Sequence, residues 1–363
     1  MDVQHSSRFT VTPSGKAVAA DARAALLEDP GFGRIFTDHM VTIRWTEGKG
    51  WHSHSVGPRE PFTLDPACAV LHYAQEIFEG MKAYRLADGS VAMFRPQENA
   101  RRFAESAERM AMPVLPQALF LEAVEELVKI DADWIPGGEG SLYLRPFMFA
   151  SETFLGVRPA AEYIFCVIAS PVGAYFKGGK TAVTLWVSEH YSRAARGGTG
   201  AAKCGGNYAA SLIAQAEASR HGCDQVVFLD AAENKWVEEL GGMNVFFVMS
   251  DGSLVTPPLG GTILPGITRD SIITLARGEG MVVREEPYSF AQWRDDAASG
   301  ALREAFACGT AAVVTAIGEV KSVEGDFTIG NGDGGLVTQK LRGALTGIQR
   351  GESEAPAGWL RRL

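Results

Sequence analysis

One lysine in this sequence stands out by its surroundings. The stretch GGTGAAKCGGNYAASL, residues 197–212, holds five glycines, four alanines and a single charged side chain, Lys203. Glycine lets the backbone approach a bound group and also builds phosphate-binding loops, so two interpretations compete. A P-loop ends in Gly-Lys-Ser/Thr, whereas Ala202 and Cys204 flank this lysine, and a dinucleotide fingerprint needs a third glycine where Lys203 stands. Both nucleotide-binding patterns therefore fail.

The remaining possibility is an amine with room for a group attached to it. A lysine amine is a poor nucleophile while protonated, near pKa 10.4 in water. Desolvation among small apolar groups lowers that pKa and makes reaction with an aldehyde practicable. Lys203 taken alone is equally compatible with a surface lysine on a flexible loop, and a nucleotide-binding module that uses residues 197–203 stays open as an alternative.

The composition limits the partners and the compartment. A formal net charge of −9 argues against a nucleic-acid partner, because phosphate binding needs a basic surface. No apolar run approaches the roughly 20 residues that span a bilayer, and the N-terminal stretch lacks the apolar segment of an export signal. The five cysteines are scattered and contain no C-x-x-C pair. We expect a cytoplasmic protein that binds neither a membrane nor a metal.

The elements that position Lys203 fall into two parts, since 363 residues favour about two domains. The first part alternates strands and helices and is typical of an α+β domain. We expect strands in residues 40–45, 68–85, 90–94, 141–149 and 162–170, a helix that begins at Pro96, and another near 116–130. Irregular, glycine-rich chain follows in residues 171–206.

The second part is expected to form a mixed sheet covered by helices. Asn207 is the expected N-cap of a helix that runs to about His221, with Tyr208, Leu212, Ile213 and Ala216 on one stripe. Further helices are expected near 268–278 and 290–297, with strands in 226–230, 234–240, 243–250, 254–259 and 281–286 and a strand pair in 311–323. The predicted domains are a small N-terminal α+β domain, 1–175, an interdomain loop, 176–205, and a larger C-terminal domain, 206–363.

A series of motifs in consistent order resembles one family. KCGGNYAASL, GCDQVVFLD, VEELGGMNVFFV, LPGITRDS and FACGTAAVV, together with IFTDHM, LHYAQEIFEGMKAYR and SLYLRP, are similar to the branched-chain amino acid aminotransferases. These are pyridoxal 5'-phosphate enzymes of fold type IV, and the resemblance extends over residues 30–350. It implies a two-domain α+β fold with a mixed sheet in the larger C-terminal domain and the cofactor in the cleft between the domains.

The resemblance also assigns the cofactor-binding residues. It makes Lys203 the catalytic Schiff-base lysine, whose freed amine then acts as the general base. Glu239, rather than its neighbour Glu238, would lie beside the pyridine nitrogen, where an anion keeps the ring protonated as an electron sink. The remaining cofactor contacts would come from Tyr208 at the ring hydroxyl and, at the phosphate, from Ile267, Thr268, Thr310 and Arg102, with Arg101 left on a solvated helix face.

The substrate residues follow in the same way. The resemblance implies an apolar pocket for a branched side chain, with walls formed by Phe36, Tyr73, Phe78, Tyr143 and Tyr175. Arg145 would orient hydroxyl groups or bind the distal carboxylate of an acidic substrate, and the backbone of Thr310 and Ala311 would bind the α-carboxylate.

The implied reaction interconverts L-leucine, L-isoleucine and L-valine with their 2-oxo acids, and 2-oxoglutarate and L-glutamate form the partner couple. A D-amino acid aminotransferase or an aminodeoxychorismate lyase of the same fold is the alternative. Relatives pair as homodimers in which residues of one subunit line the pocket of the other, and we expect the same here.

Overall fold

The computed structural model describes residues 8–173 and 182–363. The chain divides into two compact units: unit 1 is Met1–Tyr175 with Gln349–Leu363, and unit 2 is Phe176–Ile348. The sequence also predicts a boundary after residue 175, and the predicted domain bounds stay predictions. The C-terminal segment belongs to unit 1, however, although the sequence assigned it to the second domain.

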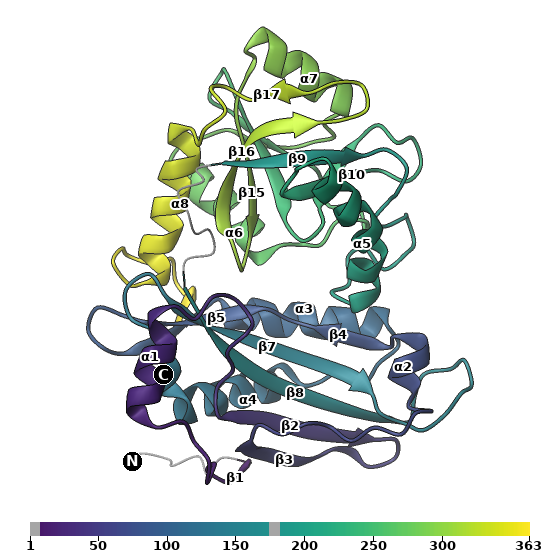
Figure 1. Ribbon diagram of the computed structural model, residues 1–363, viewed down its shortest axis with the longest axis vertical. Coiled ribbons are helices and arrows are strands. Elements are labelled where there is room, and N and C mark those ends of the chain that lie inside the picture. Colours follow the sequence, from purple (N-terminus) through teal and green to yellow (C-terminus); the bar gives the residue numbers. More distant parts are fainter. Residues whose placement is uncertain (1–7, 174–181) are drawn as a thin grey trace. The chain divides into compact units, whose positions relative to one another are not determined.

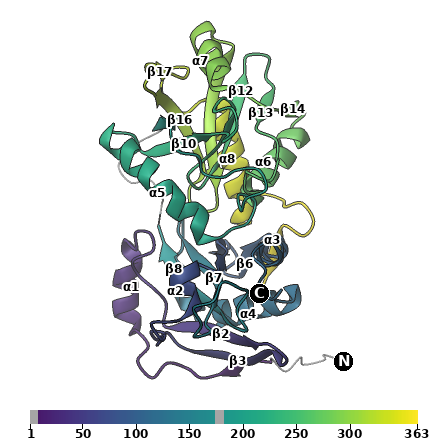
Figure 2. The same cartoon turned by 90° about the vertical axis from the view of Figure 1, so that its right-hand side faces the viewer.

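Unit 1 is built on one nine-stranded sheet (Figure 1). The strand order is β1-β3-β2-β8-β7-β5-β6-β18, and β4 pairs with β7 beside this path. Helices α3 and α4 pack against one another and on the sheet (Figure 2). The elements of unit 1 are β1 (Thr10–Val11), α1 (Ala20–Glu28), β2 (His39–Thr46), β3 (Gly50–Pro58), α2 (Ala69–Tyr73), β4 (Glu76–Phe78), β5 (Met81–Arg85), β6 (Val91–Phe94), α3 (Pro96–Arg109), α4 (Gln117–Ile130), the 3-10 turn η1 (Ala132–Trp134), β7 (Ser141–Ala150), β8 (Glu162–Val172) and β18 (Leu360–Arg362).

The C-terminus joins unit 1 through an edge strand. Strand β18 pairs antiparallel with β6, so that Leu360 lies opposite Phe94. The Arg95 N–H donates to the Trp359 carbonyl at 2.7 Å, and the Phe94 and Trp359 rings meet edge to face. A short strand without a strong pattern of its own has no sequence signal for its partner, so the pairing could be found only in the structure.

Two expectations for unit 1 are wrong in detail. Residues 68–85 do not form a continuous strand, because they contain the short helix α2 and the separate strands β4 and β5. Strand β3 was not expected at all, since its sequence GWHSHSVGP is polar and lies near the edge of the sheet between β1 and β2. Helix α3, by contrast, begins at Pro96 as expected, because proline suits the first helical position.

Unit 2 is built on a second nine-stranded sheet, which is mixed as expected. The order is β11-β10-β9-β16-β15-β12-β13-β14, with β17 paired to β16. Strand β9 runs parallel to both of its neighbours, and β13 runs parallel to β14. The elements of unit 2 are β9 (Ala182–Ser188), α5 (Gly205–Arg220), β10 (Gln225–Leu229), β11 (Val237–Leu240), β12 (Asn244–Met249), β13 (Leu254–Thr256), α6 (Ile267–Gly278), β14 (Val283–Glu285), α7 (Phe290–Ser299), β15 (Leu302–Gly309), β16 (Val313–Lys321), β17 (Phe327–Thr328) and α8 (Leu336–Gln349).

Strand β9 corrects the expectation of irregular chain in residues 171–206. Its side chains Val183, Leu185 and Val187 are buried in the core of unit 2. The sequence AVTLWVS alternates as a strand should, but the glycines on both sides concealed this short run. Around residues 311–323, where a strand pair was expected, β16 (Val313–Lys321) pairs antiparallel with the preceding strand β15.

Helix α5, which follows Lys203, also differs from the expectation. Its N-cap is Cys204, and Asn207 lies inside the helix. Leu212 and Ile213 are 65% and 47% exposed, so the expected apolar stripe is not the buried face. Small side chains such as Ala214 and Ala218 are buried instead, beside Trp186 and Phe228 of the sheet. Small residues let the helix approach the strands closely, and hydrophobicity alone does not reveal that contact.

The fold class is confirmed as a mixed α+β fold with two sheets. The core of unit 2 centres on Phe247, whose ring lies 4.4 Å from that of Tyr288 and 5.0 Å from that of Trp293. In residues 8–173 and 182–363, no helix has both the length and the hydropathy needed to cross a membrane.

Candidate active site

Lys203 and Tyr208 meet in unit 2. The Lys203 Nζ donates a hydrogen bond to the Tyr208 Oη at 2.8 Å. Lys203 lies just before helix α5, and Tyr208 lies in its first turn, so the helix start brings the two side chains together. Lys203 is half-buried. The amine is therefore held by a phenol in a partly desolvated position rather than extended from a flexible surface loop.

The glycine-rich loop explains how Lys203 is held. A Cβ atom at Gly200 would lie 2.3 Å from the Thr262 carbonyl oxygen, so only glycine allows the loop to pack on that backbone. The Asn207 amide then fastens the loop, because its Nδ2 donates to the Thr199 and Ala202 carbonyls at 2.9 and 2.8 Å. The glycines serve close backbone packing, and Asn207 is a positioning residue that the sequence had indicated only as a helix cap.

Glu239 is the buried acid of unit 2. Its side chain on β11 is 3% exposed, and its Oε1 lies 2.8 Å from the Arg193 Nη1 in an ion pair and accepts from the Leu264 N–H at 2.8 Å. Burial raises the pKa of Glu239 to about 7, and the nearby charge of Arg193 opposes that rise most strongly, followed by the Leu264 N–H and by Lys203. A carboxylate poised in this range can ionise when a cationic partner is bound.

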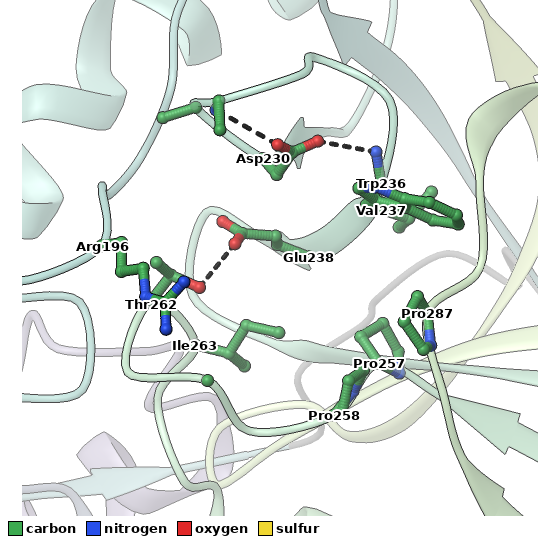
Figure 3. Close-up of a pocket in the computed structure, with 13 residues that line it drawn as sticks. Arg196, Asp230, Trp236, Val237, Glu238, Pro257, Pro258, Thr262, Ile263 and Pro287 are labelled. Atoms are coloured by element: carbon green, nitrogen blue, oxygen red, sulfur yellow. Dashed lines mark hydrogen bonds between the residues drawn. The ribbon is translucent and has the colours of Figure 1, made fainter.

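Glu238 faces the other side of β11, as the alternation of a strand requires. Its carboxylate accepts from the Thr262 hydroxyl (Figure 3). It borders a pocket of 430 Å³ that is also lined by Arg196, Trp236 and Pro257. Burial raises the pKa of Glu238 as well. The pair Glu238 and Glu239 is thus divided between two faces of the strand.

The start of helix α6 has the features that suit an anion. The N-cap is Gly266, and no side chain caps the first turn, where Ile267 and Thr268 are buried. A Cβ at Gly266 would lie 2.0 Å from the Asn244 Oδ1, and the Asn244 Nδ2 donates to the Leu264 carbonyl at 3.0 Å. The N–H groups of a first helical turn and the helix dipole favour a phosphate. Asn244 holds this turn, and nothing in the sequence analysis had given it that role.

Thr310 and Ala311 lie in the turn between β15 and β16. Asn244 pairs with Cys308 in the ladder, so this turn and the start of β12 lie at the same end of the sheet. Val313, just beyond, has φ of 62°, which a β-branched residue rarely adopts. A strained backbone conformation persists only where the surrounding contacts hold it, and such positions are common at ligand-binding turns.

Arg102 is held by a buried acid in unit 1. Its Nε and Nη2 donate to the two oxygens of Glu79 at 2.7 and 2.9 Å, and the Asn99 Nδ2 donates to the same carboxylate at 2.7 Å. Arg101 is exposed and pairs with Glu98 and Glu105 on the helix surface. The sequence had separated these two arginines in the same way, although it gave no role to Glu79.

Three of the expected substrate residues form one cluster in unit 1. The Arg145 guanidinium lies over the Phe78 ring at 4.9 Å, and its Nη2 donates to the Tyr143 hydroxyl at 3.1 Å. Among the described residues, the buried Arg145 Nε has no hydrogen-bond partner. The cluster therefore combines aromatic walls with a donor that an acidic ligand can use.

The other expected substrate residues lie elsewhere. Phe36 lines a cavity of 610 Å³ in unit 1 and contacts Arg59, whose guanidinium lies 5.2 Å from its ring. Tyr73 is 39% exposed on α2 and donates to the Leu155 carbonyl. Tyr175 lies outside the described residues. Their roles stay predictions.

The groups of unit 2 fit pyridoxal phosphate. Lys203 offers an amine for its aldehyde, and Tyr208 places a phenol beside that amine. Glu239 is a buried acid for its ring nitrogen, and the helix start at Ile267–Thr268 suits its phosphate. The cradle at Gly266, which a Cβ would fill, gives the phosphate end a specific shape.

Comparison with known proteins agrees with this geometry. Residues 76–320 match the family model of the class IV amino-transferases. A probable branched-chain-amino-acid aminotransferase of Streptomyces coelicolor is 58% identical over 97% of both chains, and the branched-chain-amino-acid aminotransferase of Mycobacterium tuberculosis is 53% identical over 99% of both. These relatives do not support the alternative of a D-amino acid aminotransferase or a lyase.

Solved structures extend the agreement to the fold. The branched-chain amino acid aminotransferase of Escherichia coli matches with a TM-score of 0.70 at 33% identity, over 88% of this chain and 98% of that one. The T.th. enzyme in complex with N-(5'-phosphopyridoxyl)-L-glutamate matches with a TM-score of 0.71 at 31% identity, over 88% and 97%. The chain therefore belongs to the class IV aminotransferases and, within them, to the pyridoxal-phosphate-dependent branched-chain-amino-acid aminotransferases.

Proposed function

We propose that the chain interconverts L-leucine, L-isoleucine and L-valine with their 2-oxo acids, with 2-oxoglutarate and L-glutamate as the partner couple, and that Lys203 carries the cofactor. The observation that supports the assignment most directly is the 2.8 Å hydrogen bond between the Lys203 Nζ and the Tyr208 Oη in the unit that also holds Glu239. The T.th. complex contains a glutamate adduct of the cofactor, which supports glutamate as the partner.

The chain's own residues divide the work of the reaction. When bound, pyridoxal phosphate supplies an aldehyde for the amino group and a ring that accepts electrons from the bond broken at Cα. Lys203 would hold the cofactor through its aldehyde and, as a free amine, would move the proton at the Cα of the amino acid. Tyr208 holds the Nζ in place, and Glu239 in its ionised form would hold the ring nitrogen.

Anion recognition is proposed for a further set of residues. The N–H groups at the start of α6 bind the phosphate, because the first turn of a helix offers donors and a favourable dipole. The backbone of the turn after β15 binds the α-carboxylate of the substrate. The residues proposed for the phosphate are Ile267, Thr268, Thr310 and Arg102, and those for the carboxylate are Thr310 and Ala311.

Side-chain selection is proposed for the aromatic residues of unit 1. Branched aliphatic side chains have no polar group, so burial against aromatic walls is the means of selecting them. Phe78 and Tyr143 provide such walls, with Phe36, Tyr73 and Tyr175 as further members. Arg145 binds the distal carboxylate of glutamate or 2-oxoglutarate, which explains how one site accepts both kinds of substrate.

A homodimer and a cytoplasmic location complete the proposal. Unit 1 exposes Leu71, Tyr73, Leu155 and Val157, the last 89% exposed, and such a group of apolar side chains is typical of a protein interface. Sedimentation equilibrium of Leu71→Glu against the unchanged chain tests this face, because a monomeric variant is the expected result. All five cysteines are buried and free, in agreement with a reducing compartment.

The decisive experiment is borohydride reduction of the holoenzyme, followed by peptide mapping. Reduction fixes the cofactor on the amine that holds it, and the expected labelled peptide contains Lys203. A label on any other lysine contradicts the assignment. Assays with L- and D-leucine then separate the proposed reaction from that of a D-amino acid aminotransferase, since only the L-isomer is expected to react.

A further inference from the structure

Arg193 is buried beside the acid that is proposed to contact the cofactor ring. Its side chain is 2% exposed, and its Nη1 lies 2.8 Å from the Glu239 Oε1. The same nitrogen donates to the Thr262 carbonyl at 3.1 Å and to the Gly200 carbonyl at 3.4 Å. One guanidinium therefore joins strand β11, the glycine-rich loop before Lys203 and the segment that leads to helix α6.

Among the neighbours of Glu239, Arg193 does most to favour its charge. Burial raises its pKa, and Glu238 on the same strand raises it further. Arg193, the Leu264 N–H and Lys203 lower it, and Arg193 is the largest of these influences. A buried carboxylate without a cationic partner takes up a proton. Glu239 in that form could not act as the anion beside a protonated ring nitrogen.

Through the two carbonyls, the charged side chain of Arg193 also contacts the loops that carry site residues. Gly200 lies three residues before Lys203. Thr262 lies two residues before Leu264, whose N–H binds Glu239. All three acceptors lie around the one Nη1 of Arg193, whose direction is fixed by the plane of the guanidinium. A lysine at this position would supply the charge with fewer fixed directions.

We propose that Arg193 is a positioning residue of the transamination reaction, which favours the ionised form of Glu239, fixes that carboxylate and joins it to the loops of Lys203 and Leu264. This inference rests on the role proposed for Glu239. Arg193 affects the titration through that acid, and it does not touch the reacting atoms.

The chain offers a matched control three residues along the same loop. Arg196 is exposed, and among the described residues it forms no ion pair or hydrogen bond. Arg193→Met and Arg196→Met therefore make the same chemical change at a buried paired site and at an open one. Arg193→Lys restores the charge without the planar group, and Glu239→Gln removes the acid itself.

The test compares these variants in two measurements besides turnover. The first is the affinity of the cofactor-free protein for pyridoxal phosphate, and the second is the pH titration of the absorbance of the holoenzyme. We expect Arg193→Met to weaken cofactor affinity by about 10- to 100-fold, the range for loss of a charged hydrogen-bonded partner, and to shift the titration. Arg193→Lys should recover much of both, and Arg196→Met should match the wild-type chain.

A double variant separates action through Glu239 from a structural role. If Arg193 acts through the acid, adding Arg193→Met to Glu239→Gln should change the titration no further. The double variant leaves no buried charge unpaired, so it carries the test even where Arg193→Met alone does not fold. A further shift in the double variant, or wild-type titration and affinity in Arg193→Met, overturns the proposal. Failure of the wild-type holoenzyme to label at Lys203 would instead reject the proposed function.

Discussion

The Lys203 Nζ lies 2.8 Å from the Tyr208 Oη, five residues along the chain, and the start of helix α5 between them sets this distance. The Nζ also lies over the Tyr208 ring, 5.4 Å from the ring centroid. A hydrogen bond from the amine to a hydroxyl fixes the direction of the amine. The proposed proton transfer needs such a fixed direction, because its efficiency depends on geometry before pKa.

Lys203→Ala should abolish transamination and leave the fold intact. The side chain is half-buried and its removal opens no large cavity, so circular dichroism and the thermal midpoint should change little. Steady-state assays with leucine and 2-oxoglutarate measure the loss. Lys235→Ala, an exposed lysine of the same unit, is the control and should keep full activity. Comparable rates in the two variants would contradict the role of Lys203.

Tyr208→Phe should slow the reaction without stopping it. The substitution keeps the ring and removes the hydroxyl that holds the Lys203 amine. A hydrogen bond to a charged group contributes about 1.5–3 kcal/mol, which corresponds to a loss of about 10- to 100-fold in kcat. The pH profile of the holoenzyme absorbance should move as well, and an unchanged profile together with an unchanged rate would reject this function for the phenol.

Arg145→Met should separate the two substrate classes. Methionine keeps much of the length of the side chain that packs on Phe78, but it removes the donors, including the Nε that has no partner in the described part of the chain. We expect KM for glutamate to rise about 10- to 100-fold, and that for leucine to change by less than about threefold. Arg44→Met, on an exposed strand position, is the control. Equal effects on both substrates would show that Arg145 does not bind the distal carboxylate.

Glu79→Ala should destabilise unit 1 far more than Glu105→Ala. Glu79 pairs with the buried Arg102, whereas Glu105 pairs with the exposed Arg101 one residue earlier on the same helix. Removing one partner of a buried pair costs about 3–5 kcal/mol, and an exposed helix pair contributes less than about 1 kcal/mol. Urea unfolding of the two variants measures the difference, and similar midpoints would mean that the buried pair is not a main support of helix α3.

The sequence predicted those features that depend on local chemistry. Helix α7 has a Ser289 cap that accepts from the Gln292 N–H and ends at Gly300 with φ of 77°, and both signals can be read in the letters. Alternation along a strand likewise predicts that Glu238 and Glu239 face opposite sides, and the family resemblance then selected Glu239. The family motifs supplied the roles of Lys203 and Tyr208.

The remaining features depend on contacts between distant segments. Glu79, Arg193 and Asn244 each hold a candidate site residue or its turn, but each lies about 20 or more residues away from the group it holds. Strand β18 pairs with β6, although most of the sequence separates the two strands. Residue type and periodicity describe one segment at a time, so they do not indicate which buried arginine meets which acid.

Glu239→Gln should make the stability of the cofactor-free protein less dependent on pH. In the folded protein the pKa of Glu239 is raised to about 7, mainly by burial, from an ordinary value of 4.5. As the pH rises between these values, the folded state keeps a proton that the unfolded state has released, so the free energy of unfolding falls. The loss in free energy of unfolding reaches up to about 3 kcal/mol above pH 7 and is absent below the ordinary pKa of 4.5.

Because glutamine does not titrate, the stability of the Glu239→Gln variant should fall less than that of the wild-type chain between pH 4.5 and 7. Urea unfolding across this range tests the difference, with Glu217→Gln on helix α5 as the control; parallel curves for Glu239→Gln and the wild-type chain would show that Glu239 is ionised in the folded protein throughout.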